Sequence, residues 1–281
     1  MSSTFWLTTL AMVAFAGNSI LARLALGDGA IDAAGYTGVR LASGAAVLAL
    51  LLVNANRNSS PTVRLPGGWP SALALFVYAV AFSYAYLQLG AAVGALVLFA
   101  SVQATMIAWG LIRGERPGLS EIAGLTIAFA AFVYWIAPAL VTPALLGTVL
   151  MIASGVAWGV YSLRGRAATD PMGETAGNFI RTVPLAIPLI ALSAFQSGMT
   201  IAGIVIATAS GAVTSGLGYV LWYRALPGLT ATRASIVQLT VPVIAALGGV
   251  LFLAEALNLR FVLAATLILG GIALALLVRK G

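Results

Sequence analysis

Tyr36-Thr37-Gly38-Val39-Arg40 has a counterpart about 140 residues later in the chain, Gly177-Asn178-Phe179-Ile180-Arg181. The run that ends at Glu115 has its counterpart at the same displacement, in the run that ends at Glu255. Five apolar spans belong to the first half of the chain, and five belong to the second. A unit that crosses a membrane an odd number of times leaves its copy inserted upside down. The pattern therefore predicts two inverted repeats, an arrangement that encloses a binding site in many membrane carriers.

The composition is that of an integral membrane protein, because 61% of the 281 residues are hydrophobic and 7% are charged. Soluble domains contain about 25% charged residues. Ten crossings of about 20 residues use about 200 residues, which leaves no room for a soluble domain. We therefore predict an all-α integral membrane protein of ten transmembrane helices, built as two inverted five-helix repeats at 1–140 and 141–281. The expected spans are 5–26, 34–53, 69–88, 92–112, 121–137, 145–163, 176–195, 201–223, 231–253 and 260–278.

The basic residues predict the orientation of these spans. With the N-terminus inside, most of the 14 Lys and Arg residues fall on the inner side. This positive-inside bias predicts that both termini are cytoplasmic. The inner residues are Arg57, Arg64, Arg113, Arg116, Arg164, Arg166, Arg181, Arg224, Arg233, Arg279 and Lys280, and the outer residues are Arg23, Arg40 and Arg260.

Several kinds of site are excluded by the residues that the chain lacks. The net charge of +7 does not indicate nucleic-acid binding, because the basic residues are scattered between apolar spans. The chain has no Cys and no His, which removes thiolate sites and the commonest metal ligand. We expect no metal, no cofactor, no catalytic residues and no enzymatic activity. No proton coupling through a central acid is expected, because all seven acids lie in loops or at span ends: Asp28, Asp32, Glu115, Glu121, Asp170, Glu174 and Glu255.

Glycines and prolines predict how the helices pack and bend. Gly155 and Gly159 form a GxxxG pair on the sixth span, which allows another helix to approach closely. Pro184 and Pro188 in the seventh span and Pro242 in the ninth each remove a backbone donor, so we expect kinks there. Such kinks either only shape the helices or line a solute pathway, where the freed carbonyls meet water.

Polar and aromatic side chains recur at helical spacing within the spans. Because a buried amide costs several kcal/mol unless it is hydrogen-bonded, these groups should face the interior of the bundle. One interpretation is hydrogen bonding between helices plus interfacial Trp and Tyr belts. The other is a central cavity whose aromatic faces hold apolar or cationic parts of a small solute, while amides and hydroxyls bind its polar parts. The candidate cavity residues are Asn18, Tyr78, Ser83, Tyr86, Gln103, Trp158, Tyr161, Ser215, Tyr219, Trp222 and Gln238.

Arg40 and Arg181 occupy matching positions in the two repeats. Each lies within about 10 Å of a span end, at ~1.5 Å per residue. Two interpretations stay open for each. The side chain either reaches the interface or pairs with carbonyls in a gate, or it contacts a substrate carboxylate.

Three motifs, in this order, resemble the EamA branch of the drug/metabolite transporter superfamily. They are Arg113-Gly114-Glu115-Arg116-Pro117, Ala157-Trp158-Gly159-Val160-Tyr161 and Val237-Gln238-Leu239-Thr240-Val241-Pro242. The five-plus-five duplication and the lack of a soluble domain fit this resemblance. Within the branch, Ala100-Ser101-Val102-Gln103-Ala104-Thr105-Met106 and the Arg-rich end of the sixth span are most similar to YddG-type exporters.

This resemblance implies export of amino acids, aromatic ones included, and of related small metabolites or cationic compounds by alternating access. The location would be the bacterial inner membrane. It also implies that Trp158, Tyr78 and the surroundings of Gln103 and Gln238 lie near the cavity, and that the glutamates Glu115 and Glu255 are structural. The expected partners are a small-molecule substrate and the lipid bilayer, with the chain a monomer or a homodimer.

Other functions remain open at this point. A flippase for lipid-linked sugars, or another metabolite carrier of the superfamily, would share these features. A channel would need rings of charge or a carbonyl filter, and an intramembrane enzyme would need a nucleophile and a base. Neither set is visible in the sequence.

Overall fold

The computed structural model describes residues 3–27, 29–55, 65–139, 144–196, 199–253 and 259–277, and within these ranges the chain is helical, without strands. Nine of the helical segments in these ranges are long and apolar enough to cross a membrane. Two segments, η1 and η3, are π-helical, and two others, η2 and η4, are 3₁₀ turns. The elements are α1 (Ser3–Ala22), η1 (Arg23–Gly27), α2 (Ala33–Ala55), α3 (Trp69–Ile112), α4 (Leu119–Ile136), η2 (Ala137–Ala139), α5 (Leu145–Gly165), α6 (Pro171–Gln196), α7 (Ile201–Ala209), η3 (Ser210–Leu217), α8 (Gly218–Ala225), η4 (Leu226–Gly228), α9 (Ala231–Val237), α10 (Thr240–Leu253) and α11 (Leu259–Leu277).

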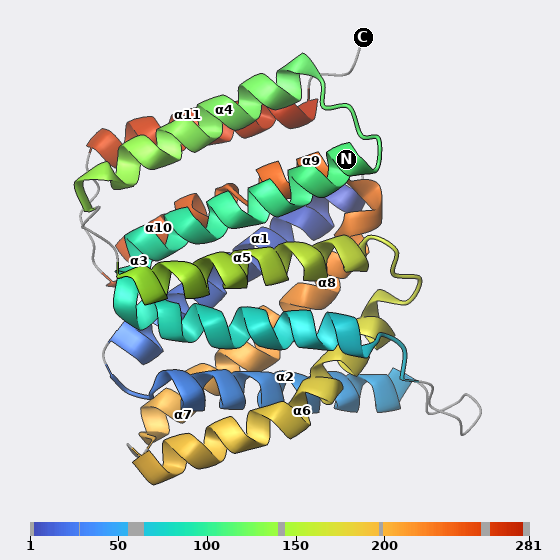
Figure 1. The fold of residues 1–281 in the computed structure, drawn as a ribbon, viewed down its shortest axis with the longest axis vertical. Helices are drawn as coiled ribbons and strands as arrows, with labels where there is room; N and C mark the ends of the chain where they lie inside the picture. The colour runs from blue at the N-terminus through green and yellow to red at the C-terminus, as the bar shows by residue number, and fades with distance from the viewer. Residues whose placement is uncertain are drawn as a thin grey trace.

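The helix α3 is interrupted at Gly90. Its 44 residues would extend about 66 Å as a straight helix, about twice the thickness of a bilayer's hydrocarbon core. Gly90 has φ 70° and ψ 177°, a conformation that glycine adopts at little cost. The chain turns back there, so the two arms of α3 lead across the molecule and return (Figure 1). The sequence predicted separate spans at 69–88 and 92–112, and Gly90 lies between them.

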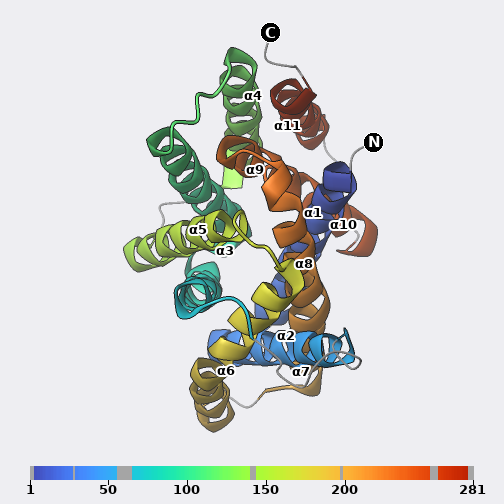
Figure 2. The same ribbon diagram turned by 90° about the vertical axis from the view of Figure 1, so that its right-hand side faces the viewer.

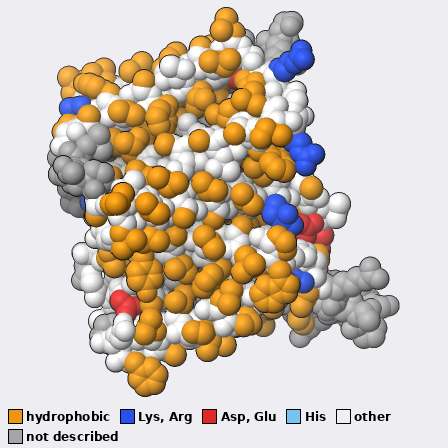
Figure 3. Space-filling model, viewed as in Figure 1, with side chains coloured by type: hydrophobic (Ala, Val, Ile, Leu, Met, Phe, Trp, Pro, Cys, Tyr) orange, Lys and Arg blue, Asp and Glu red, His pale blue; other side chains and the backbone are white. Residues whose placement is uncertain are grey.

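The helices end at two opposite faces of the molecule. The N-terminal face is the one at which α1 begins and both arms of α3 have their outer ends, and the far face is the one that holds Gly90 (Figure 1). Between the two faces the visible surface is largely apolar, and Lys and Arg side chains gather along the N-terminal edge (Figure 3). This distribution is that of a multi-pass membrane protein. The predicted repeat boundary and six charged residues used in the sequence analysis lie outside the described residues: Asp28, Arg57, Arg64, Glu255, Arg279 and Lys280.

Close contacts at glycine hold the helices together. A Cβ added to Gly155 would lie 2.6 Å from the Cβ of Ser101 and 2.7 Å from the oxygen of Leu98, so the GxxxG face of α5 packs on the second arm of α3. At one end of the molecule, α4 and α11 pair side by side (Figures 1 and 2). Gly124 and Gly271 lie in this contact, because a Cβ added to either glycine would meet the carbonyl oxygen of the other. Such contacts are the usual means of association in lipid, where no hydrophobic effect operates between helices.

The three prolines have different surroundings. Pro184 and Pro188 lie within α6, which continues as a helix through both, and both residues are exposed on its outer surface. Pro242 lies in the first turn of α10, directly after the break that separates α9 from α10. Because Pro242 has no N–H for the carbonyl of Gln238, that carbonyl accepts instead from the N–H of Val241, at 3.1 Å.

We expect Gly271→Ala to destabilise the protein by about 1–3 kcal/mol, the typical cost of overpacking. The added Cβ would lie 2.6 Å from the carbonyl oxygen of Gly124. Gly270→Ala is the matched control, because nothing lies within 4 Å of a Cβ at Gly270. The measurement is the midpoint temperature of the detergent-solubilised protein, followed by size-exclusion chromatography after heating. Equal midpoints for the two variants would contradict the packing of α4 on α11.

Candidate functional site

Two adjoining cavities lie between the helices. The larger, which we call the vestibule, has a volume of about 340 Å³, and the smaller, which we call the inner pocket, has a volume of about 40 Å³. Arg23, Ala91 and Ala139 line the vestibule and are exposed at the far face, so the vestibule opens there. The two cavities share walls, which connects the far face with the middle of the molecule. The residues common to both are Ser19, Phe82, Leu98, Phe99 and Val241.

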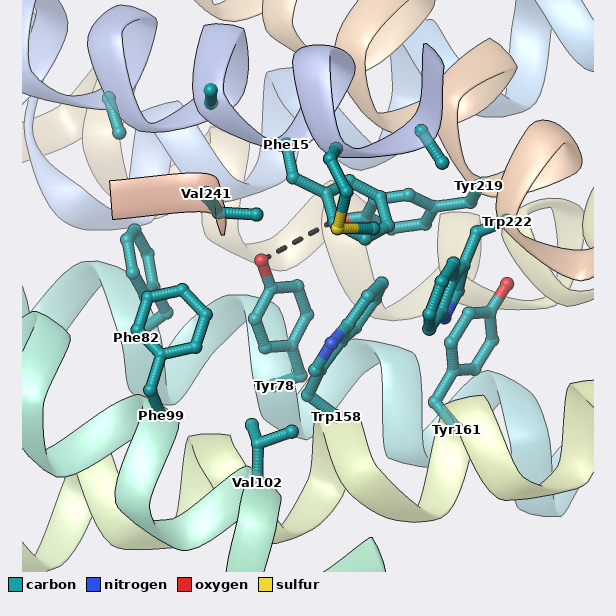
Figure 4. Close-up of a cluster of buried hydrophobic side chains, with 14 of the residues drawn as sticks. Phe15, Tyr78, Phe82, Phe99, Val102, Trp158, Tyr161, Tyr219, Trp222 and Val241 are labelled. Carbon is teal, nitrogen blue, oxygen red and sulfur yellow. Dashed lines mark hydrogen bonds between the residues drawn. The ribbon is translucent and has the colours of Figure 1, made fainter. Parts of the chain in front are cut away.

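Aromatic rings from four helices surround the inner pocket (Figure 4). The ring of Trp158 on α5 lies centrally, with ring centroids 4.8 Å from Tyr78, 4.8 Å from Tyr219 and 5.2 Å from Phe15. The Phe15 ring meets the indole edge-on, which is a favoured geometry for aromatic pairs. The inner pocket is therefore lined largely by aromatic rings.

Gln238 fixes the orientation of Trp158. The indole Nε1 of Trp158 donates to Gln238 Oε1 at 2.7 Å, and Gln238 Nε2 donates to the carbonyl of Ala234 at 2.9 Å. Gln238 itself lies at the break between α9 and α10. Trp158 therefore offers its ring face, and not its N–H, to the inner pocket.

Arg40 is the buried charge nearest the inner pocket, and its side chain is held by hydroxyl groups. Its residue exposure is 1%, so the guanidinium does not reach the interface. Its Nε donates to Ser215 Oγ at 2.8 Å, and its Nη2 donates to the hydroxyls of Tyr219 at 2.6 Å and Tyr78 at 3.4 Å. No carboxylate of the described ranges pairs with it. The Nη1 atom is buried without a partner there, an unusual state for a charged group.

The π-helical segment η3 brings together the hydroxyls that surround Asn18. Asn18 Oδ1 accepts from Ser210 at 2.6 Å, and from Thr214 and Ser215 at 3.4 Å each. An ordinary helix would place Ser210 and Thr214 on one face with Ser215 turned aside, whereas the wider π turn lets all three converge. Segments of this kind are frequent at functional sites.

The N-terminal face is closed below the inner pocket. Trp222 Nε1 donates to Ser162 Oγ at 3.0 Å, and the Tyr223 hydroxyl donates to the carbonyl of Tyr161 at 3.1 Å. At the edge of this face, Glu115 accepts from the N–H of Ala231 at 2.9 Å and pairs with Arg166 at 3.0 Å. These contacts join α3, α5, α8 and α9.

The structure distributes the predicted cavity residues over three places. Ser83 and Ser215 lie behind the cavity walls in hydrogen bonds to Thr37 and Arg40. Gln103 is buried, lines neither cavity, and has no partner for its Nε2 in the part of the chain that the structure describes. Tyr161 and Trp222 belong to the closed contact at the N-terminal face. Those that line a cavity are Asn18, Tyr78, Tyr86, Trp158, Tyr219 and Gln238.

The remaining predicted residues lie farther from the inner pocket. Arg181 is half-buried and donates to the carbonyls of Pro66, Gly177 and Leu65, so it holds the chain that enters α3. Of the three prolines, only Pro242 lines a cavity, the vestibule.

Sequence reasoning overlooked several residues of the site. Phe15, Phe99 and Val241 line the inner pocket but look like ordinary membrane residues in the sequence. Ser210 and Thr214 are absent from the predicted cavity residues, because the expected period of 3.6 residues does not allow for a π turn. A cluster of three hydroxyl residues within six positions of an apolar span was the available signal.

The two glutamines in the middle of the bundle should respond differently to replacement. Gln238→Leu removes the acceptor of a buried indole N–H, which should cost about 1–3 kcal/mol. Gln103→Leu removes a buried nitrogen that has no partner among the described residues, so no loss is expected. Thermal midpoints of the two purified variants in detergent provide the comparison. Equal losses would contradict a special role of the bond between Trp158 and Gln238.

Comparisons with known proteins agree on the class of this chain. Residues 145–277 match the EamA-like transporter family. An uncharacterized protein of Pseudomonas aeruginosa is 50% identical over 99% of this chain and 96% of its own length. An uncharacterized transporter of Archaeoglobus fulgidus is 29% identical over 72% of this chain and 76% of its own. A crystal structure with 21% identity covers 98% of both chains with a TM-score of 0.81, which shows a shared fold. Residues 145–277 therefore form an EamA-like transporter domain, of the drug/metabolite transporter superfamily.

Proposed function

We propose that this protein exports amino acids, aromatic ones included, and related small metabolites by alternating access. The observation that carries this proposal is a cavity that opens at one face, reaches the middle of the molecule and is closed at the other face. A carrier has such a shape in one of its two end states, because only one gate is open at a time. One chain supplies every wall of the cavity, so we propose that a monomer is sufficient for transport.

The pattern of helix contacts supports ten crossings arranged as inverted repeats. The two arms of α3 count as separate crossings, and α7 joined to α8, like α9 joined to α10, counts as one crossing, which gives ten in total. Matching each of the first five crossings with the crossing five places later exchanges the two halves of the chain. Under this exchange the pairs α2 with α6 and α4 with α11 map onto themselves. The contacts of α5 with the first and second arms of α3 map onto those of α1 with α8 and α10, which also exist. The vestibule and the inner pocket lie between the two proposed repeats.

The orientation follows from the charges at the two faces. Arg113, Arg166 and Arg233 lie at helix ends on the N-terminal face, whereas Arg23 and Arg260 lie on the far side. The positive-inside rule then makes the N-terminal face cytoplasmic, with both termini there. We propose an inner-membrane protein of a bacterium, seen with its vestibule open to the outside.

The size and chemistry of the vestibule favour a small amphipathic solute. A volume of about 340 Å³ lies at the low end for small-molecule sites, ~300–1,000 Å³, and is too small for a lipid-linked sugar. Aromatic walls suit an apolar body, and Asn18, Ser19 and the tyrosine hydroxyls suit polar ends. Among the described residues that line the two cavities, Arg23 is the one with a charge, and Arg40 lies close behind the inner pocket, so we leave cationic compounds out of the proposal.

Counterflow in liposomes that contain only this protein tests the function. Liposomes loaded with unlabelled phenylalanine should take up labelled phenylalanine, and Trp158→Ala should slow the initial rate by about tenfold through loss of aromatic contact. Trp69→Ala is the control, because Trp69 is 52% exposed at a helix end. A pH gradient alone should not drive accumulation, since no Asp or Glu lines the described cavities. Equal rates for both variants, or no counterflow of any amino acid, would refute the proposal.

Single cysteines test the orientation, because the chain has no Cys of its own. Ala92→Cys lines the vestibule and should react in intact cells with a membrane-impermeant maleimide, more slowly when phenylalanine is added. Thr169→Cys lies at an exposed position between α5 and α6 on the N-terminal face and should not react from outside. Labelling of the second variant but not the first would mean that the protein is inserted the other way up.

A further inference from the structure

The charge of Arg40 has no counter-ion among the described residues, although the side chain is fully buried. A guanidinium has five N–H groups and no acceptor. Three hydroxyl oxygens accept from Nε and Nη2, and the Nη1 atom has no partner in the described ranges. Burying a positive charge in an apolar bundle is expensive, so such residues in transporters usually belong to the substrate pathway. The protein thus holds a positive charge next to the inner pocket.

Each hydroxyl that accepts a hydrogen bond from Arg40 still has its own hydrogen to donate to another group. Tyr219 receives a hydrogen bond from Arg40 and donates to the Tyr78 hydroxyl at 3.4 Å. Tyr78 accepts from both of these groups, and nothing in the described part of the chain accepts its proton. Tyr78 lines the inner pocket, so its hydroxyl is a donor available to a ligand. The positive charge behind it strengthens this donor, as in other hydrogen bonds that involve charged groups.

Asn18 provides a second donor in the same pocket. Its Oδ1 is occupied by the hydroxyls of Ser210, Thr214 and Ser215, and its Nδ2 donates to no residue of the described ranges. Asn18 also lines the inner pocket. Within the described residues, the pocket lining therefore has two donors without an acceptor, and no carboxylate.

We propose that the inner pocket binds the carboxylate of the transported solute through the Tyr78 hydroxyl and the Asn18 amide, with Arg40 as a positioning residue behind them. The inference rests on the proposed function and names its substrate class. The pocket, at about 40 Å³, holds one small group, and the aromatic or aliphatic body of the solute lies in the vestibule beside Phe82 and Phe99. Arg23 at the mouth adds a second positive charge along the path.

This arrangement recognises the acid and not the amine. A protonated amine in the inner pocket would face two donors and the charge of Arg40, with no acceptor of opposite charge. A solute that keeps its carboxylate but lacks the amino group should therefore still bind. The substrate class is that of carboxylates with an apolar body, amino acids among them.

Competition for phenylalanine counterflow by three related compounds tests the inference on the intact protein. We expect 3-phenylpropionate, which lacks the amine, to compete about as well as unlabelled phenylalanine. Phenethylamine, which lacks the carboxylate, should compete at least about tenfold more weakly, the effect of losing a hydrogen bond to a charged group.

Two variants separate recognition from folding. Tyr78→Phe deletes one oxygen and should weaken both acids by about tenfold while leaving phenethylamine unchanged. Arg40→Lys keeps the positive charge and should retain more preference for acid over amine than Arg40→Gln. Tyr134→Phe is the matched control, because Tyr134 is 48% exposed on α4 and lines neither cavity.

The outcomes distinguish this inference from the proposed function. If phenylalanine counterflow occurs but acid and amine compete equally, or Tyr78→Phe leaves their ratio unchanged, the carboxylate subsite is refuted and transport stands. If the wild-type protein moves no phenylalanine in the first place, the proposed function fails, and this inference fails with it.

Discussion

The centre of the molecule depends on one electrostatic constraint, which is that the buried charge of Arg40 must be solvated by the protein. In a bilayer no water is at hand for a guanidinium, and an unsatisfied polar group costs several kcal/mol. Hydroxyls from three helices therefore gather around it: Tyr78 on α3, Ser215 on η3 and Tyr219 on α8. Ser215 lies in the π-helical segment η3 and contacts both Arg40 and Asn18.

The two faces of the molecule differ in how their helices meet. At the N-terminal face, large aromatic side chains and the Glu115 carboxylate join α3, α5, α8 and α9. At the far face the corresponding helix ends stand apart around the vestibule, whose walls near the mouth include small residues such as Ala91 and Ala139. Alternating access requires that such a difference can reverse. Glu115 is well placed to contribute, because its contacts cross from one half of the chain to the other.

Close packing at glycine and side-chain hydrogen bonds contribute to this fold in different ways. The contacts of Gly124 with Gly271 and of Gly155 with Ser101 bring backbones close without fixing any chemistry. One group of side-chain hydrogen bonds lies around Arg40, Asn18 and Trp158, beside the cavities. Another group joins the helix ends at the N-terminal face.

The sequence by itself determined the membrane class, the helical architecture and the positions of the breaks between spans, because hydrophobic length and charge asymmetry are local properties. It also indicated Trp158, Tyr78, Tyr219 and Gln238, since aromatic and amide side chains are conspicuous in an apolar span. Only the tertiary structure decided how Arg40 differs from Arg181 and Gln238 from Gln103, although each pair looks alike in the sequence. The reason is physical: whether a polar side chain is buried, capped by carbonyls or left without a partner depends on helices far away in the chain. A π turn in η3, which no periodicity rule anticipates, set the partners of Asn18 in the same way.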